Sequence, residues 1–532
     1  MDTMEVIGEL LIKDATSVHS PIIPRVTDAG TFAYNLLQLG GTTTGSVAAA
    51  VEHRNADESS WTNAGSFLTA TSTGPKLKAI SGGLKELTRF KFTLNSGSSD
   101  AWARVAIMPP VWTSAAVLGS MSGTLRLTPG LAPSIYLGSG FQGPVQQTVR
   151  DPPDPQIAVG NRFVLVVVNE QLSVYSSHDL KLRMARPLGG VRGIFPISHV
   201  SEVRCFFDNY ASAQRFVISA LQNVMGSTIV WLAVSITSDP TAGWYVYRYD
   251  PHKGLDFAGA GYDEHLYTVG ALTSLFVWKK SRVLVGKGAP PPTELSLPPA
   301  DGSYPQPVQS FGATGYHYVL QKTRHVIDHL AVWAINDSTL ALSGPVFVAI
   351  VAKDPPGELP TCLNNTIQGA DGRMEQATYR NGILYGSFGS EVGLPPFKRA
   401  AQWVEVDPNG WPTGLQRPTL RSTGVVAYRH HVGLSALAVN AAGQAGMVVE
   451  TSDIKMPPGI AVHGRDAFGN TTGVVSVKTG VCKSGTNRRW GDYFGIAVDE
   501  EDGSFWAIGE YWLSPAAGDK WATWVQNFQV IP

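Results

Sequence analysis

Hydrophobic residues along most of this chain occur in short alternating or continuous runs, a pattern that predicts β-strands rather than helices. Residues Leu87–Asn95 alternate in the way expected of a strand with one buried face. The longest apolar runs, Phe163–Val168 and Val346–Ala352, are strand-sized and far shorter than the roughly 18 residues of a membrane helix. Clusters of glycine, proline, asparagine and serine separate the runs. We therefore predict an all-β chain without membrane insertion.

One pattern recurs from Asp151 to Pro532: an opening polar residue, an apolar strand, a tight turn and a second strand. It is clearest in residues 154–169 and 203–220, and fainter in five further segments. These are residues 257–270, 306–320, 374–388, 432–449 and 493–509. Repeats of this size predict a β-propeller of six or seven blades, with seven as the preferred number.

A propeller protects its sheet edges only when its first and last blades meet. We therefore expect the last strands, around Trp506–Phe528, to close against the first blade. Four tryptophans are expected to pack between blades and not to serve as ligand platforms. These are Trp231, Trp244, Trp490 and Trp506.

The amino-terminal part has a different organisation. Short alternating strands separated by Gly, Ser and Thr clusters predict a small β-sandwich over residues 28–110, serving as an attachment domain. Residues 1–27 contain Pro21 and Pro24 and are predicted to be an extended arm that orders against a neighbouring subunit. Residues 111–150, rich in Gly, Ser, Leu and Pro, are predicted to be a linker to a propeller over residues 151–532.

Composition excludes several classes of partner. The formal net charge is -1, with 41 basic and 42 acidic residues, so nucleic acid is not an expected partner. Cys205, Cys362 and Cys482 are odd in number and far apart, and we interpret them as small buried hydrophobes without a disulfide or a zinc site. Acidic residues in the first 14 positions do not fit a signal peptide, which predicts synthesis in a cytoplasm. No cofactor or metal is expected.

Three motifs carry a family resemblance. The segments Asp154-Pro-Gln-Ile-Ala-Val-Gly, Trp231 to Tyr247 and Arg489 to Trp506 together resemble a group of large bacterial and phage-associated propeller proteins. The resemblance spans roughly residues 151–528 and implies the propeller fold, without a single chemistry for the group. Residues 51–67, followed by a Gly-Gly-Leu turn and an aromatic strand, look like small β-sandwich domains common in phage head and tail proteins.

Polar residues near the start of the innermost strands are expected to line the propeller channel, where hydrogen-bonded side chains are structurally useful. These are the candidate binding residues, and none is assigned a catalytic role. They are Asp154, Arg204, Asp208, Asp256, Gln306, Glu375, Gln376, Arg489 and Asp492.

Other candidate sites have simpler structural explanations. The turn Asp499-Glu-Glu-Asp-Gly lacks the alternating order of a calcium loop and fits an acidic hairpin turn. Adjacent residues on a strand point to opposite faces, so His430 and His431 do not share a site there. Residues Arg324, His325, Asp328 and His329 are likewise interpreted as structural. Phosphate-loop, nucleophile-elbow and zinc-protease signatures do not occur.

The preferred interpretation is a virion surface protein of a phage or phage-like particle, a decoration, fibre or spike protein on the head or tail. Its amino-terminal domain would attach it to other virion proteins in an oligomeric assembly. Its propeller would contact a host-surface glycan or a protein. Two alternatives stay open: a glycoside hydrolase with carboxylates at the propeller mouth, and a bacterial propeller binding protein.

Overall fold

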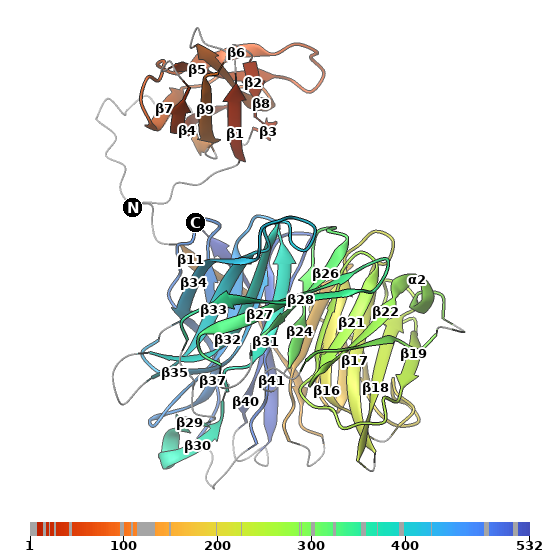
Figure 1. Cartoon of the computed structure of the whole chain (residues 1–532). Coiled ribbons are helices and arrows are strands. Elements are labelled where there is room, and N and C mark those ends of the chain that lie inside the picture. The colour runs from red at the N-terminus through yellow and green to blue at the C-terminus, as the bar shows by residue number, and fades with distance from the viewer. Residues whose placement is uncertain are drawn as a thin grey trace. The chain divides into compact units, whose positions relative to one another are not determined.

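The protein is described by a computed structural model in which strands predominate (Figure 1). The described residues are 8–13, 17–20, 22–25, 28–41, 45–95, 100–107, 110–113, 133–147, 151–197, 199–224, 226–286, 288, 290–298, 304–322, 326–352, 358–369, 371–392, 398–426, 428–482, 489–513 and 520–531. Within them, helix is confined to α2 (Lys280–Val283) and the 3-10 turn η1 (Cys362–Asn364). The chain divides into two compact units, residues 1–131 and 132–532. The chain is therefore all-β, as predicted.

The first unit contains two five-stranded sheets. One sheet has the order β1-β9-β4-β10, with β7 also paired to β4, and the other has the order β2-β8-β5-β6, with β3 also paired to β8. The strands of the first sheet are β1 (Gly8–Lys13), β4 (Ala29–Gly40), β7 (Gly74–Ile80), β9 (Trp102–Ile107) and β10 (Val111–Thr113). Those of the second sheet are β2 (Ser17–His19), β3 (Ile23–Pro24), β5 (Ser46–Arg54), β6 (Thr62–Ser66) and β8 (Leu87–Asn95).

Aromatic side chains join the two sheets of this unit through one core. Alternate residues of β4 and β8 are buried, which matches the alternation seen in the sequence. Tyr34 on β4 meets Phe92 on β8 edge to face, with ring centroids 5.1 Å apart. Phe32 and Phe90 form a second such contact at 5.8 Å. The sheets therefore pack face to face.

The prediction of an arm over residues 1–27 is wrong for its described part. Strand β1 pairs antiparallel with β9, from Gly8 opposite Ile107 to Lys13 opposite Trp102. Strand β2 pairs with β8. Ile12, Val18 and Ile23 pack in the core of this unit. Local sequence does not reveal these pairings because they span about 70 to 100 residues. Residues 1–7 lie outside the described part.

The second unit consists mainly of four-stranded antiparallel sheets (Figure 1). Five are separate, and two four-stranded groups, β20–β23 and β31–β34, are joined through parallel pairing with β25. The first three groups are β12 (Gln156–Gly160), β13 (Phe163–Val167), β14 (Gln171–Ser176) and β15 (Leu182–Pro187); β16 (Ser201–Asp208), β17 (Arg215–Val224), β18 (Ser227–Ser235) and β19 (Trp244–Tyr249); β20 (Gly259–Tyr262), β21 (Leu266–Ala271), β22 (Ser274–Lys279) and β23 (Thr293–Ser296).

The next groups continue in chain order. They are β24 (Pro305–Pro307), β26 (Tyr316–Gln321), β27 (His329–Asn336) and β28 (Leu342–Ala349), with β25 (Gln309–Ser310) between; β31 (Met374–Arg380), β32 (Ile383–Val392), β33 (Lys398–Asp407) and β34 (Thr419–Val426); β35 (His431–Val439), β36 (Ala445–Asp453), β37 (Met456–Arg465) and β38 (Val475–Thr479). The last group combines β39 (Gly495–Val498), β40 (Phe505–Trp512) and β41 (Trp521–Ile531) with β11 (Ser134–Val145). A two-stranded hairpin, β29 (Glu358–Thr361) and β30 (Asn365–Gln368), lies outside these groups.

Each strand pair predicted from the sequence is the first hairpin of one four-stranded group. The Asn381-Gly382 turn, for example, joins β31 to β32, and both residues have positive φ (52° and 82°) as such turns require. The first strands contact one another in succession, β12 with β16, then β20, β24, β31, β35 and β39, and β39 contacts β12. The arrangement is therefore propeller-like, with the first strand of every group innermost.

The last sheet is completed by a strand from the opposite end of the unit. Strand β11 pairs antiparallel with β41, from Ser134 opposite Ile531 to Val145 opposite Ala522. This strand lies inside residues 111–150, so the prediction that this whole segment is a linker is wrong. Its glycines and prolines obscured the strand pattern, and its pairing partner lies nearly 400 residues away. Residues 114–132 lie outside the described part.

The tryptophans predicted to pack do lie in hydrophobic clusters. Trp231, Trp490 and Trp506 are at most 5% exposed, and Trp244 is partly buried. Trp506 packs with Ile157 and Val164 of the first sheet and with Val525 of the last. The first and last sheets therefore share a core, as the closure prediction requires.

A disulfide corrects the interpretation of the cysteines. Cys362 in η1 is bonded to Cys482, which follows β38, across a sequence separation of 120 residues. Cys205 is a free, buried cysteine, as expected. The pair was missed because only the packing of the β29–β30 hairpin against β36 and β37 brings the two cysteines together.

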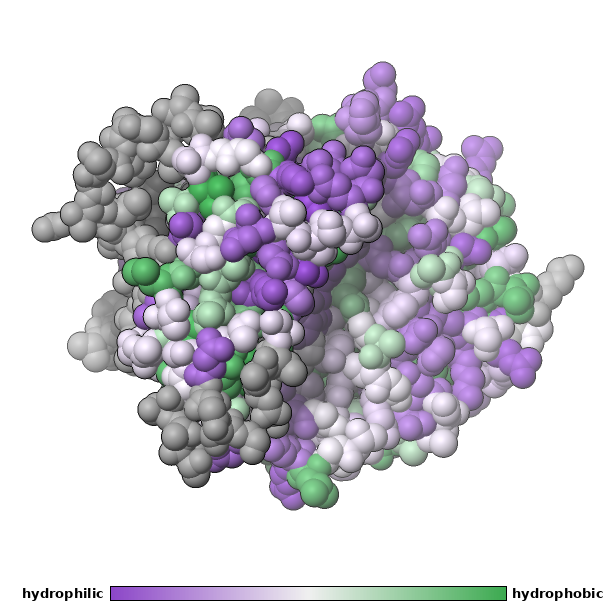
Figure 2. All heavy atoms as spheres, turned by 90° about the horizontal axis from the view of Figure 1, so that it is seen from above, coloured by the Kyte–Doolittle hydropathy of each residue, from purple (hydrophilic) through white to green (hydrophobic). Residues whose placement is uncertain are grey.

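Hydrophobic and hydrophilic residues are interspersed on the surface. On the face shown in Figure 2, hydrophobic residues occur singly or in small groups between hydrophilic ones. Highly exposed hydrophobic residues, such as Leu68, Val191 and Leu415, are likewise far apart in the sequence. None of the described helices is long and apolar enough to cross a membrane.

Candidate functional site

Several of the predicted channel residues are buried and bond the main chain in or beside another inner strand. Arg204 Nε donates to the carbonyl of Ala258 at 2.6 Å, and Gln376 Nε2 donates to that of Ile496 at 3.2 Å. Glu375 accepts a hydrogen bond from the main-chain N–H of Ser435. These contacts tie separate sheets together, which is the structural use expected of channel residues.

Three further predicted residues make contacts of other kinds. Asp208, at the far end of β16, is fully buried, pairs with Lys280 and accepts a hydrogen bond from the Tyr267 hydroxyl at 2.7 Å. Burial raises the pKa of Asp208, and the Lys280 charge opposes that shift. Asp256 is exposed in the loop before β20. Gln306 is buried on β24, against Gly259.

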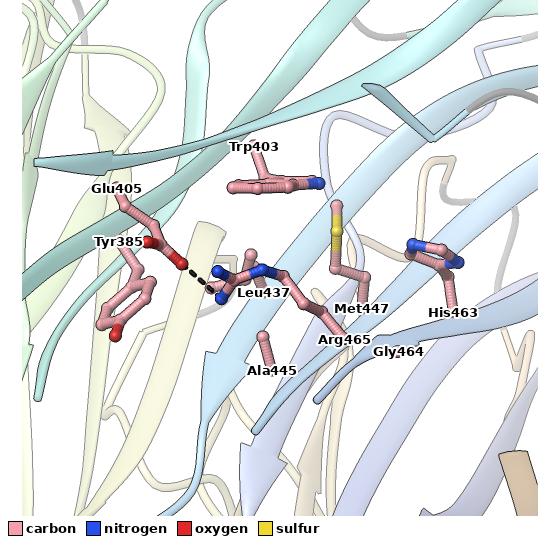
Figure 3. Close-up of a pocket in the computed structure, with 9 residues that line it drawn as sticks. All are labelled: Tyr385, Trp403, Glu405, Leu437, Ala445, Met447, His463, Gly464 and Arg465. Atoms are coloured by element: carbon pink, nitrogen blue, oxygen red, sulfur yellow. Dashed lines mark ion pairs between the residues drawn. The ribbon is translucent and has the colours of Figure 1, made fainter. Parts of the chain in front are cut away.

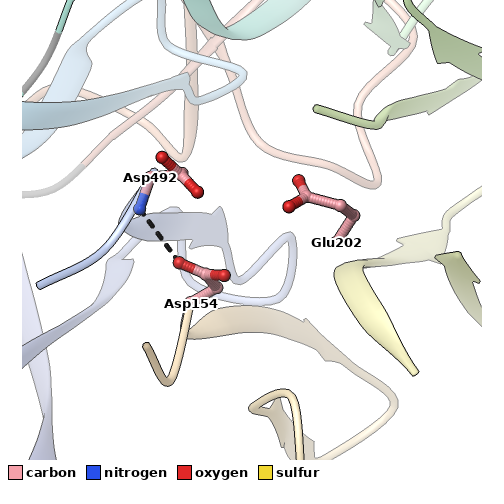
Figure 4. A group of neighbouring side chains, drawn as sticks. All are labelled: Asp154, Glu202 and Asp492. Carbon is pink, nitrogen blue, oxygen red and sulfur yellow. Dashed lines mark hydrogen bonds between the residues drawn. The ribbon is translucent and has the colours of Figure 1, made fainter. Parts of the chain in front are cut away.

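The fold brings Asp154 and Asp492 together with Glu202, a residue that the sequence did not single out (Figure 4). Asp154 and Asp492 precede β12 and β39, and Glu202 lies near the start of β16. One carboxylate oxygen from each lies within 4.8 Å of the others. The three side chains therefore meet at one end of the inner strands.

Hydrogen bonds hold this carboxylate cluster in place. Asp154 accepts from the main-chain N–H of Asp492 at 2.9 Å and from Asn169 Nδ2 at 2.8 Å. Asp492 accepts from Gln368 Nε2 at 2.6 Å and pairs with Arg489, whose side chain is half exposed. Burial, and then the Asp492 charge, raise the pKa of Asp154 to about 7. Burial, and then the Asp154 charge, raise the pKa of Glu202 to about 8.

Arginines and aromatic rings surround the cluster. The Arg204 guanidinium lies 3.4 Å from the ring centroid of Tyr493, whose hydroxyl donates to Glu202 at 3.4 Å. Arg373 lies 3.6 Å from the ring centroid of Phe257 and pairs with Asp371. The sequence alone did not single out Tyr493 or Arg373 as site residues. Tyr493 stands directly after Asp492, and this position next to a predicted channel residue was a usable signal.

A small void between two other sheets does not have the size of a ligand site (Figure 3). It measures about 10 Å³ and is lined by Trp403, Met447, His463 and the Arg465–Glu405 ion pair. One water needs roughly 10 to 15 Å³. Burial lowers the pKa of His463 to about 4, so this side chain is neutral at pH 7.

A larger opening lies at the other end of the first and last sheets, and we call it the groove. It comprises a cavity of about 740 Å³ and a second of about 490 Å³, and Arg162 lines both. The larger cavity is lined by Ser139, Arg162, Ser177, His178, Asp179, Leu180, Asp499, Glu501, Asp502, Trp506 and Asn527. Asp154 precedes β12 and Arg162 follows it, so the groove and the carboxylate cluster lie at opposite ends of that strand.

Arg162 has a positive φ, as do several other non-glycine residues of the chain, among them Leu180 of the same lining. Asn161 and Arg162 form the turn between β12 and β13 and have φ of 46° and 67°. Such a turn favours glycine at the second position, because a side chain there is sterically strained. Asn161 Nδ2 anchors the turn by donating to Ser238 Oγ at 2.9 Å. The fold thus holds an exposed arginine in a strained conformation at the junction of the two cavities.

The other sequence candidates make local contacts. Asp499 accepts a hydrogen bond from the main-chain N–H of Glu501 at 3.0 Å, as in an acidic hairpin turn. His430 pairs with Asp453, and His431 Nδ1 accepts from the main-chain N–H of Arg399. Asp328 contacts the neighbouring His329 at 2.7 Å. Arg324 and His325 lie outside the described residues.

Comparison with known proteins gives distant structural similarities. No known family model matches the sequence, and no curated protein does. Kluyveromyces lactis Hsv2 is similar over 71% of this chain and 100% of its own, at 9% identity and a TM-score of 0.36. Drosophila Semaphorin 1b, extracellular domains 1-2, is similar over 75% and 88%, at 9% identity and 0.36. A subtype N10 neuraminidase-like protein of A/little yellow-shouldered bat/Guatemala/060/2010 is similar over 56% and 90%, at 7% identity and 0.33. Similarities of this degree carry no information on ligand or activity.

Proposed function

We propose that residues 132–532 form a seven-bladed β-propeller, closed by β11, that binds an oligosaccharide in the groove. The first unit is proposed to be a β-sandwich that attaches the propeller to other proteins of an assembly. The ring of contacts among the inner strands and the pairing of β11 with β41 support the propeller. The shape and chemistry of the groove support the ligand.

The groove suits a ligand that carries both hydrogen-bond donors and acceptors. Its main cavity, at about 740 Å³, falls within the roughly 300 to 1,000 Å³ of small-molecule sites. Glu501 and Asp502 offer acceptors, while Arg162 and His178 offer donors. Sugar hydroxyls donate and accept at once, so they can use both sets. The Trp506 Nε1 group of the lining is buried and has no hydrogen-bond partner among the residues that the structure describes.

The observation that carries this proposal is that Arg162 lines both cavities of the groove while its backbone is held at positive φ. A side chain held at positive φ costs on the order of 1 kcal/mol or more, and strain of this kind concentrates at functional sites. Glycine at this position would suit the turn better. Keeping an arginine there is explained if its guanidinium contacts the ligand, because both cavities meet at this residue.

The test uses the full-length protein and Arg162→Gly. Wild-type protein is screened on a glycan array, and the affinity for a retained oligosaccharide is measured by calorimetry. Arg162→Gly should bind at least about tenfold more weakly, a loss of about 1.4 kcal/mol. Its thermal stability should be close to wild type, because relief of strain offsets the flexibility of glycine. Arg248→Ala, an exposed arginine change elsewhere, is the control.

Two results would overturn the proposal. One is the absence of any bound glycan on the array. The other is wild-type affinity in Arg162→Gly. Release of new reducing ends from a bound oligosaccharide would favour the alternative of a glycoside hydrolase, and its loss in Asp492→Asn would place that chemistry at the carboxylate cluster.

The virion surface location stays a prediction. A groove that binds glycans fits a particle that attaches to a host surface, and it fits a bacterial binding protein equally well. Mass spectrometry of purified particles would distinguish the two, because a virion component must be present in them at a fixed ratio to the other particle proteins.

A further inference from the structure

The arginines around the carboxylate cluster of Asp154, Glu202 and Asp492 do not offset all of its negative charge, because Arg373 also pairs with Asp371. Each of the three residues is at most 8% exposed. Arg489 pairs with Asp492, while Arg373 lies 3.9 Å from Asp492 and is bonded to Asp371 at 2.7 Å. Asp154 accepts its hydrogen bonds from neutral donors, and Glu202 accepts one long bond from Tyr493. The Arg489 charge acts on Asp154 and the Arg204 charge on Glu202, but neither arginine forms an ion pair with them among the described residues. Buried carboxylates arranged in this way must be protonated or be neutralised by a bound cation.

A fourth carboxylate points to a cation independently. Glu510 on β40 is fully buried, and neither of its carboxylate oxygens has a hydrogen-bond partner within the described part of the chain. Its Oε1 packs against Gly491, where an added Cβ would lie only 2.6 Å away. Gly491 is the residue before Asp492, so the Glu510 side chain is aimed at the backbone that carries the cluster.

The donor set and its spacing select the kind of ion. All the ligand atoms are carboxylate oxygens, which hard divalent cations prefer, and neither histidine nor cysteine belongs to the group. Two oxygens bound to one Ca²⁺ at about 2.4 Å can be at most about 4.8 Å apart. The oxygens of Asp154, Glu202 and Asp492 satisfy this limit. Mg²⁺ requires shorter bonds of about 2.1 Å and a stricter octahedral geometry.

We propose that Asp154, Glu202 and Asp492, backed by Glu510, bind a Ca²⁺ ion. The ion links the start of β12, the start of β16 and the segment before β39, and so fastens the first two inner strands to the last. The ion acts at the end of the strands opposite the groove. The Ca²⁺ proposal does not depend on the glycan proposal.

The proposal is tested with full-length protein freed of metal by a chelator. Addition of CaCl2 at millimolar concentration should raise the melting temperature by several degrees, and MgCl2 should raise it less. Tb³⁺ serves as a luminescent substitute for Ca²⁺. Because the Tyr493 hydroxyl contacts Glu202, tyrosine-sensitised Tb³⁺ emission should appear with one ion per chain and be displaced by Ca²⁺.

Variants locate the ion. Glu202→Gln should weaken Ca²⁺ binding by at least about tenfold, since it removes one charged ligand, while the hydrogen bond from the Tyr493 hydroxyl that it also alters is long. Glu501→Gln, in the acidic turn at the other end, is the matched control and should bind as wild type does. Absence of both the thermal shift and the emission in wild type would overturn the proposal. A loss of Ca²⁺ binding in Glu501→Gln without a loss in Glu202→Gln would also overturn the proposal.

Discussion

The main-chain N–H of Asp492 donates a hydrogen bond to the Asp154 carboxylate at 2.9 Å, across 338 residues of sequence. A parallel contact joins Gln156 Nε2 to the carbonyl of Phe494 at 2.8 Å. The first and last inner strands are therefore bonded directly, in addition to the outer closure by β11 and β41. Separating the first sheet from the last requires these contacts to break.

The outer closure predicts a difference between two residues of β11. Phe141 packs against Tyr175 of the first sheet, with ring centroids 4.6 Å apart, whereas Leu137 is 39% exposed. Phe141→Ala should lower the free energy of unfolding by about 2 kcal/mol, and Leu137→Ala by much less. Equilibrium denaturation of both variants measures the effect. Equal losses would mean that β11 does not pack as described.

The disulfide predicts sensitivity to reductant. Cys362 and Cys482 enclose 120 residues, and a cross-link of this span restricts the unfolded chain. Reduction should cost on the order of 2 to 4 kcal/mol of stability. The double variant Cys362→Ser/Cys482→Ser should show the same loss and no further response to reductant. Cys205→Ala is the control and should respond as wild type does. A wild type indifferent to reductant would contradict the pairing.

A buried glutamate predicts part of the pH dependence of stability. Glu450 is fully buried, and burial raises its pKa to about 8, although the main-chain N–H of Leu434 and the charge of Arg399 oppose the shift. In the unfolded chain the group ionises near its ordinary value, so the native state holds the extra proton between that value and pH 8. Stability should therefore fall as the pH rises through this window.

The slope contributed by Glu450 is on the order of 1 kcal/mol per pH unit. Glu450→Gln does not titrate, so its stability should fall less between pH 5 and pH 8 than that of wild type. Denaturation curves at several pH values, in chelator, measure both slopes. Parallel curves for the two proteins would show that Glu450 is already ionised in the fold.

Local sequence patterns were sufficient for the hairpins of the second unit. The alternation of apolar residues and turn pairs such as Asn381-Gly382 depend on neighbours in the chain, and these hairpins form where predicted. Long-range pairings could not be read in this way. Strand β1 meets β9, and β11 meets β41, through backbone bonds that leave no local mark.

The difference between local and long-range signals also explains which residues of the carboxylate cluster and the groove were predicted. Asp154 and Asp492 were found because each opens a recognisable inner strand. Glu202 was missed because its role depends on residues from two other sheets. The groove was missed because turns from several strands build it, and no local pattern marks Arg162 as the residue that lines both cavities.

Hydrogen exchange with and without a bound oligosaccharide tests the central claim most directly, because it locates the ligand on the unaltered protein. Binding in the groove should protect the amides of residues 160–163, 177–180 and 499–504 and leave those of residues 200–204 and 490–494 unchanged. Protection confined to residues 200–204 and 490–494 would place the ligand at the carboxylate cluster and contradict the account.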